Sequence, residues 1–169
     1  IASLGLQAGD EVITPALTFS TTVAPLIQQG LIPAFVDVEP DSYVIDPEQI
    51  ERMITPKTRA LMIPNLIGNL ADWSRLKEIA DKHNLRTIED SADTIGNLYK
   101  GQPTGELSDI STTSFYASHV MTGAGFGGMV CFNDDDIYSK AKQLRGWGRQ
   151  SSLVGESEAI EDRFAVEVD

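Results

Sequence analysis

The chain has 169 residues, with 25 acidic and 13 basic side chains, a net charge of −12 and a single cysteine. A chain this acidic repels phosphate backbones, which argues against nucleic-acid binding, and it has no signal peptide and no apolar run near the roughly 20 residues of a membrane span. The single cysteine excludes an intrachain disulfide framework and is typical of a cytoplasmic protein, and Cys131, in an apolar run, is predicted to be buried.

Short apolar runs alternate with helical patterns in the first half of the chain. The apolar runs predict strands at residues 11–15, 32–38, 60–64 and 85–89. The helices between them are predicted to start at a capping cluster at residues 20–22, at Asp46 with Pro47, and at Asp72. Ile50, Met53 and Ile54 would form the buried stripe of the second helix. This alternation predicts an α/β fold with a mainly parallel sheet and right-handed crossovers.

The pattern changes in the second half. Residues 99–102 predict a hairpin turn, and strands at 110–116 and 128–132 follow without an obvious helix between them. Three aspartates at residues 134–136 predict a helix start, because acidic side chains there favour the helix dipole, and this is preferred to a metal site. The chain becomes polar and acidic after Gly146, which predicts a loop.

Polar residues follow the ends of two predicted strands. Asp90 ends one strand, and Ser114 and His119 lie at and after the end of the next. Ligands of open α/β sheets bind at the carboxyl ends of strands, where an aspartate can pair with a protonated ring nitrogen; the alternative is that Asp90 only caps its own turn. His119 follows small neighbours and is a candidate general base, whereas His83 near a helix end is assigned a structural role.

A glycine-rich segment at residues 123–128 formally matches the dinucleotide fingerprint G-x-G-x-x-G. That fingerprint must follow a strand and open a helix, whereas this segment opens a strand. The sequence therefore does not predict a dinucleotide site here.

Several motifs together resemble one family in order and spacing, the sugar aminotransferases of the DegT/DnrJ/EryC1/StrS family. They are Gly9-Asp10-Glu11-Val12-Ile13, Phe19 with its Ser-Thr run, Phe35-Val36-Asp37-Val38, Ile88-Glu89-Asp90-Ser91-Ala92 and Ser114-Phe115-Tyr116-Ala117. These are fold-type-I pyridoxal-phosphate (PLP) enzymes that act on nucleotide-linked keto sugars. The resemblance covers nearly all of the chain and implies the large domain of the aspartate aminotransferase-like fold.

The resemblance implies a role for each motif residue. Asp90 would pair with the pyridine nitrogen of the cofactor, Phe19 would stack on its ring, and Ser114 would contact its phosphate. The family then expects a lysine five residues after the serine to hold the cofactor covalently, but His119 stands there. This exchange resembles the 3-dehydrases of 4-keto-6-deoxy sugars, which bind free pyridoxamine phosphate (PMP). Asp93, assigned to the cofactor site, and Leu66-Ile67-Gly68-Asn69 also resemble that branch.

The sequence is therefore interpreted as a PMP-dependent dehydrase that removes the C3 hydroxyl of a nucleotide-linked 4-keto-6-deoxyhexose in deoxysugar biosynthesis. His119 would remove a proton from the cofactor C4′ carbon. Trp147-Gly148-Arg149 is followed by no cysteine, which argues against the iron–sulfur cluster of some relatives. The glycine segment is one residue longer than the family's usual Gly-Glu-Gly-Gly and lacks its glutamate.

Two alternatives remain at this stage: a PLP-dependent nucleotide-sugar aminotransferase with another anchoring lysine, and a non-catalytic cofactor-binding relative. The chain is expected to be a fragment, because it lacks an initial Met, residues 1–6 resemble the end of a helix, and residues 164–169 resemble an interrupted strand. Residues 1–149 would be the central part of the PLP-binding large domain, and residues 150–169 an acidic link toward a missing C-terminal region. The fragment alone is expected to be inactive, and the resemblance implies a homodimer.

Overall fold

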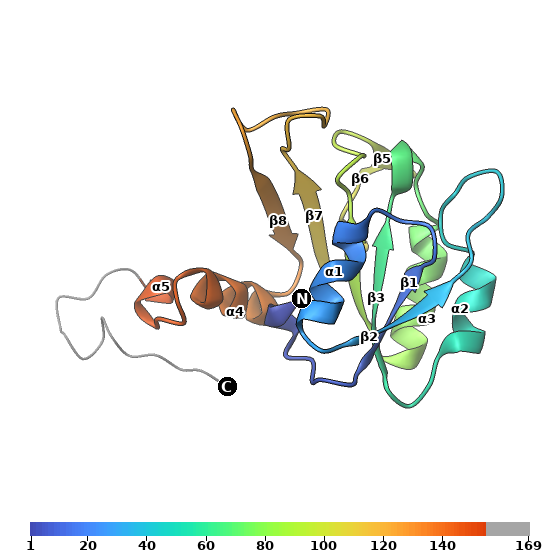
Figure 1. Ribbon diagram of the computed structural model, residues 1–169, viewed down its shortest axis with the longest axis horizontal. Coiled ribbons are helices and arrows are strands. Elements are labelled where there is room, and N and C mark those ends of the chain that lie inside the picture. Colours follow the sequence, from blue (N-terminus) through green and yellow to red (C-terminus); the bar gives the residue numbers. More distant parts are fainter. Residues whose placement is uncertain (155–169) are drawn as a thin grey trace.

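A six-stranded sheet forms the centre of the computed structural model, which describes residues 1–154 (Figure 1). The strands lie in the order β2-β1-β3-β4-β7-β8. Their bounds are β1 Glu11–Pro15, β2 Ile32–Val36, β3 Thr58–Pro64, β4 Arg86–Asp90, β7 Ile110–Ser114 and β8 Gly128–Phe132. Neighbouring strands are parallel except for β7 and β8, which form an antiparallel pair. The predicted mainly parallel sheet is confirmed.

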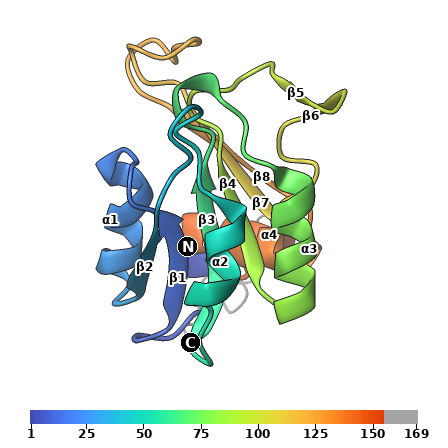
Figure 2. The same cartoon turned by 90° about the vertical axis from the view of Figure 1, so that its right-hand side faces the viewer.

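Helices cover both faces of the sheet. Their bounds are α1 Ser20–Gln28, α2 Pro47–Met53, α3 Trp73–His83, α4 Asp135–Arg145 and α5 Ser151–Val154, with short 3-10 turns at Ala2–Leu4 and Leu66–Gly68. Figure 2 shows α1 on one side of the sheet and α2 and α3 on the other. Leu26 of α1 and Ile137 of α4 belong to one apolar cluster, and Trp73 of α3 belongs to the other. Within the described residues no helix combines the length and the apolar character needed to cross a membrane.

Aspartates start three of the helices, as the sequence predicts. Asp46 accepts a hydrogen bond from the Glu48 N–H, Asp72 from the Arg75 N–H, and Asp134 from the N–H groups of the first turn of α4. Each carboxylate satisfies N–H groups that have no partner within the helix and lies at the positive end of the helix dipole. These local signals need no tertiary context, which is why they could be identified in the sequence.

The predicted hairpin turn is also confirmed. The short strands β5 (Leu98–Tyr99) and β6 (Gln102–Pro103) pair antiparallel. Lys100 and Gly101 between them have φ values of 51° and 84°. Two successive positive φ values are typical of the two-residue turn that matches the twist of a hairpin.

Four expectations about local structure are wrong. Helix α1 has Phe19 as its N-cap and no side-chain cap, so the hydroxyl cluster at residues 20–22 does not cap it. Met53 is exposed, because α2 ends there and the chain continues extended at Ile54. The first residues form one 3-10 turn rather than the last turn of an α-helix. The loop predicted after Gly146 contains α5, while the strand predicted from residue 164 lies outside the described residues.

Cys131 is exposed rather than buried. It lies on β8, which pairs only with β7 among the described strands and has residues 128–131 exposed. Only Phe132, at the end of β8, packs against the apolar cluster that contains Ile137 of α4. An apolar sequence run identifies a strand but not its place in the sheet, and an edge strand has fewer covering neighbours.

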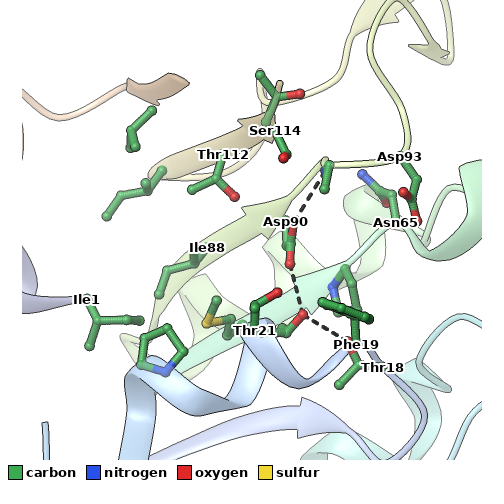
Figure 3. Close-up of a pocket in the computed structure, with 18 of the residues that line it drawn as sticks. Ile1, Thr18, Phe19, Thr21, Asn65, Ile88, Asp90, Asp93, Thr112 and Ser114 are labelled. Carbon is green, nitrogen blue, oxygen red and sulfur yellow. Dashed lines mark hydrogen bonds between the residues drawn. The ribbon is translucent and has the colours of Figure 1, made fainter. Parts of the chain in front are cut away.

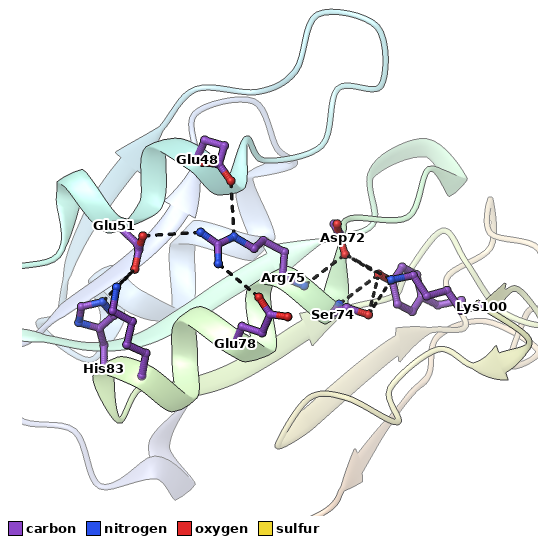
Figure 4. Close-up of polar contacts among 10 residues, drawn as sticks. Glu48, Glu51, Asp72, Ser74, Arg75, Glu78, His83 and Lys100 are labelled. Atoms are coloured by element: carbon purple, nitrogen blue, oxygen red, sulfur yellow. Dashed lines mark hydrogen bonds and ion pairs between the residues drawn. The ribbon is translucent and has the colours of Figure 1, made fainter.

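An ion-pair network joins α2 to α3 (Figure 4). The Arg75 guanidinium lies within 3.6 Å of carboxylate oxygens of Glu48, Glu51 and Glu78. Glu51 also pairs with Lys82 and with His83, and hydrogen bonds from these two side chains lower the pKa of the Glu51 carboxyl. His83 therefore has the structural setting that the sequence assigns to it. Because these groups are partly or largely exposed to solvent, the network orients the helices more than it stabilises the fold.

Candidate functional site

A cavity of about 1150 Å³ opens at the carboxyl end of the sheet. Ile88 and Asp90, which alternate along β4, line it together with Thr112 and Ser114 of β7 (Figure 3). Because side chains alternate between the two faces of a strand, Glu89 between them lies on the other face. The alternation therefore separates two adjacent carboxylates, one in the cavity and one in the core.

The strand connections explain where the cavity lies. From β1 the chain passes through α1 to β2 at one edge, and then through α2 to β3 on the other side of β1. Helices on opposite faces leave a crevice where the strand order reverses, and ligands of open α/β sheets bind there. The start of α1 and the ends of β3, β4 and β7 all border this crevice.

The Asp90 carboxylate is held by a chain of hydroxyl groups. The Thr22 hydroxyl donates a hydrogen bond of 2.9 Å to Asp90 Oδ2, and the Thr18 hydroxyl donates one of 2.9 Å to Thr22 Oγ1. The Ala92 N–H lies 3.3 Å from Asp90 Oδ1. These donors fix the orientation of the carboxylate, so it can accept a hydrogen bond from an N–H group of a ligand in the cavity.

Thr22 and Thr18 are the residues that sequence reasoning missed. The sequence predicts that the hydroxyl run at residues 20–22 caps a helix, but Thr22 instead contacts a carboxylate 68 residues later in the chain. A threonine near the start of a helix gives the same sequence pattern whether its hydroxyl caps the helix or supports a distant carboxylate. Only the packing of α1 beside β4 distinguishes the two.

His119 lies on the loop that follows β7. The strand ends at Ser114, two residues earlier than predicted, and the His119 N–H donates to the Tyr116 carbonyl at 3.0 Å. The imidazole lines the cavity and meets the Tyr116 ring edge-on, with the ring centroids 6.0 Å apart. His119 Nδ1 is buried and has no hydrogen-bond partner among the described residues. A buried polar atom without a partner is costly, and this cost disappears when a ligand supplies one.

Phe19 and Asp93 complete the set of predicted site residues. Phe19 borders the cavity with 70% of its surface exposed, so an aromatic face is available for stacking. Asp93 also borders the cavity, but its Oδ2 accepts the backbone N–H of Ile67 at 3.0 Å. The structure therefore brings all five predicted residues to one cavity, and it gives the Asp93 carboxylate a backbone partner.

A second carboxylate, Glu89, is buried on the opposite face of β4 with 1% of its surface exposed. Its oxygens accept hydrogen bonds from the Asn65 amide, the Ser91 hydroxyl and the Gly105 N–H at 2.8 to 2.9 Å. Burial raises the pKa of Glu89, and these hydrogen bonds oppose the rise. Because the Asn65 N–H also donates to the Asp90 carbonyl at 2.9 Å, this buried network supports the strand end that carries Asp90.

The residues present fit a pyridoxal-type cofactor. They offer an exposed aromatic face, an oriented carboxylate, a strand-end hydroxyl at Ser114 and an imidazole whose Nδ1 lacks a partner. None of the described residues that line the cavity is a lysine. Across residues 1–154, no group of three or more His, Cys, Asp or Glu side chains is arranged to hold a metal ion. The aromatic face, the carboxylate and the hydroxyl are therefore groups that a pyridoxal-type cofactor can use.

Comparison with known proteins agrees with this geometry. The profile of the DegT/DnrJ/EryC1/StrS aminotransferase family matches residues 1–164. The lipopolysaccharide biosynthesis protein RfbH of Salmonella typhimurium is 46% identical over 85% of this chain and 33% of its own length. GDP-perosamine synthase of Caulobacter vibrioides is 38% identical over 88% of this chain and 40% of its own length. The dTDP-4-dehydro-2,6-dideoxy-D-glucose 3-dehydratase of Saccharopolyspora spinosa is 42% identical over 85% of this chain and 31% of its own length. The chain thus spans a third to two fifths of these relatives.

Solved structures share the fold. An aminotransferase from Psychrobacter cryohalolentis superposes with a TM-score of 0.91 at 33% identity and covers 99% of this chain and 42% of its own. The GDP-4-keto-6-deoxy-D-mannose-3-dehydratase of E. coli superposes with a TM-score of 0.86 at 27% identity and covers 96% of this chain and 44% of its own. That structure contains bound hydrated PLP. Both reaction classes occur among the neighbours, so the fold does not choose between them.

Proposed function

The chain belongs to the DegT/DnrJ/EryC1/StrS aminotransferase family, and from this membership we propose that it is the central part of a PMP-dependent dehydrase. The enzyme would remove the C3 hydroxyl of a nucleotide-linked 4-keto-6-deoxyhexose, without an iron–sulfur cluster. The observation that carries the proposal is His119, which lines the cavity with an unpartnered Nδ1 while no lysine lines it among the described residues. The names of two similar proteins, both 3-dehydratases of 4-keto sugars, support the reaction class.

The cofactor would be held by residues of three elements. Asp90, oriented by Thr22, would pair with the pyridine nitrogen, Phe19 would stack on the ring, and Ser114 would bind the phosphate. Asp93 would belong to the cofactor site, where its carboxylate also accepts the backbone N–H of Ile67 in the Leu66–Gly68 turn. When bound, the cofactor supplies an amine that condenses with the sugar ketone and a ring that withdraws electrons from the neighbouring carbons.

His119 would move the proton that this chemistry requires. Imidazole accepts and returns a proton near neutral pH, but it cannot replace lysine as the covalent anchor. Its contact with the Tyr116 ring orients it toward the cavity. Histidine at this position would offer no amine that could bond to the cofactor in place of the sugar, and this is a chemical reason for histidine there.

A second candidate function is a nucleotide-sugar aminotransferase, and the similarity to GDP-perosamine synthase favours it. That reaction needs an anchoring lysine. The six lysines of the chain are Lys57, Lys77, Lys82, Lys100, Lys140 and Lys142, and none of them lines the cavity. A non-catalytic relative that only binds the cofactor remains the third candidate, and turnover distinguishes it from the other two.

The loop after β7 favours the homodimer that the family resemblance implies. Tyr116, Val120, Met121 and Phe126 are large apolar side chains of this loop, exposed by 49 to 82%. Contiguous exposed apolar side chains mark interaction sites. We propose that a second copy covers them beside the cavity. Sedimentation is expected to show a dimer that Phe126→Asp weakens, and a monomeric unchanged protein would contradict this proposal.

The test of function is a single turnover. The full-length protein is loaded with PMP and given GDP- or dTDP-linked 4-keto-6-deoxyhexose, and the sugar is analysed by mass spectrometry and NMR. The expected product lacks the oxygen at C3, and His119→Asn is expected to bind PMP but to leave the sugar unchanged. A product with an amine at C4 and an intact C3 hydroxyl would overturn the dehydrase and establish the aminotransferase.

A further inference from the structure

The turn between β3 and α3 holds a strained residue at the cavity. Ile67, in the middle of the Leu66–Gly68 turn, has φ 52° and ψ 26°, the left-handed region that β-branched residues avoid. Its side chain is 65% exposed and lines the cavity. An exposed apolar side chain in a strained conformation lowers the stability of the fold on both counts.

Three hydrogen bonds to two other segments of the chain hold this strained turn. Asp93 Oδ2 accepts the Ile67 N–H at 3.0 Å, and the Asn97 amide donates to the Gly68 carbonyl at 3.2 Å. On the other side, the Asn69 amide donates to the Ser42 carbonyl at 2.7 Å. Strain of this kind persists only where the surroundings impose it, and it concentrates at ligand sites.

Glycine in the same turn would remove both the strain and the exposed apolar surface. The Ile67 side chain therefore contributes favourably only when something apolar covers it. Leu17 and Phe19, whose side chains are also exposed, line the same cavity. The hexose of the ligand expected here, a nucleotide-linked 6-deoxyhexose, carries one apolar substituent, the methyl group at C6.

We propose that Ile67, held by Asp93, is a specificity-determining residue that contacts the C6 methyl group of the sugar and discriminates against sugars with a hydroxyl there. This inference rests on the proposed function and deepens it. A hydroxyl placed against the Ile67 side chain would lose its water without gaining a hydrogen-bond partner. Discrimination at a single apolar contact of this size is about tenfold in affinity.

Equilibrium binding tests the proposal without turnover. The PMP-loaded full-length protein is titrated by calorimetry with a nucleotide-linked 6-deoxyhexose and with the matching 6-hydroxy sugar, both carrying a hydroxyl in place of the C4 ketone so that neither reacts. The unchanged protein is expected to prefer the 6-deoxy sugar about tenfold. Ile67→Gly is expected to abolish the preference, to leave PMP affinity unchanged and to keep or raise the melting temperature.

Tyr43→Gly is the matched control. Tyr43 also has a positive φ, 61°, and an exposed side chain, but it does not line the cavity. Its replacement relieves similar strain and is expected to keep the tenfold preference. Asp93→Ala, which removes the acceptor for the Ile67 N–H, is expected to reduce the preference, whereas Asp93→Asn keeps an acceptor oxygen and is expected to retain it.

Two other results separate the inference from the function on which it rests. Equal affinity for the two sugars in the unchanged protein, or a preference that survives Ile67→Gly, would overturn the role of Ile67 and leave the dehydrase intact. Binding of PMP without binding of either sugar, tried with both GDP and dTDP, would overturn the proposed substrate class and this inference together.

Discussion

Replacement of His119 by lysine is expected to turn a protein that releases PLP into one that keeps it covalently. After incubation with PLP, reduction with borohydride and denaturation, the unchanged protein is expected to show no added mass. His119→Lys is expected to carry one cofactor per chain on the introduced lysine. The measurement is intact mass followed by peptide mapping, with PMP binding measured separately by absorbance.

The expectation follows from the position of residue 119 in the cavity. It lies beside the strand end that carries Ser114, in the cavity that also contains the oriented Asp90 carboxylate. A lysine amine there can bond to the cofactor aldehyde and be fixed by reduction, whereas imidazole cannot. The His119 side chain also lines this cavity, and its buried Nδ1 has no hydrogen-bond partner among the described residues.

His83→Lys is the matched control, since it exchanges the same residue types outside the cavity, at the end of α3. It is expected to show no adduct, which would show that a new lysine reacts only when it lies in the cavity. A stoichiometric adduct on a native lysine of the unchanged protein would refute the dehydrase and indicate an aminotransferase with a relocated anchor. Failure of His119→Lys to form an adduct while it still binds PLP would place residue 119 away from the cofactor aldehyde.

Replacement of Glu89 by alanine is expected to lower the free energy of unfolding by about 3 kcal/mol or more. The change leaves the Asn65 amide, the Ser91 hydroxyl and the Gly105 N–H buried without their acceptor. Glu89→Gln keeps one acceptor oxygen and is expected to lose about 1 to 2 kcal/mol. Urea unfolding followed by circular dichroism measures both, with the exposed Glu106→Gln as a control that should change little.

The difference in the free energy of unfolding between the unchanged protein and Glu89→Gln is also expected to depend on pH. Burial raises the pKa of Glu89 in the folded protein, so between the ordinary glutamate pKa and the raised value the folded state binds more protons than the unfolded state. Stability then falls as the pH rises through this window, because the carboxyl must lose its proton while buried. The stability of the unchanged protein relative to Glu89→Gln is therefore expected to be highest in acid. The opposite trend would mean that the surrounding donors outweigh burial.

The elements that the sequence predicts correctly rest on local physical chemistry. Asp46, Asp72 and Asp134 start helices because a carboxylate satisfies the N–H groups of a first turn wherever the helix packs. Alternation of strands with helices restricts the sheet to parallel pairs, and strand ends in a parallel sheet share one edge. This is why Asp90 and Ser114, separated along the chain, could be expected in one site from the sequence alone.

The remaining features depend on neighbours that are distant in sequence. Thr22 supports Asp90 because α1 packs beside the end of β4, Glu89 is satisfied by groups from three segments, and Cys131 is exposed because β8 lies at an edge of the described sheet. The strained turn at Ile67 is likewise held by hydrogen bonds to the loop that carries Asp93 and Asn97 and to the loop that carries Ser42. Local sequence thus determined the elements and the residues available for chemistry. Only the tertiary structure decided their partners, because a hydrogen bond or a buried face depends on which segments folding brings together.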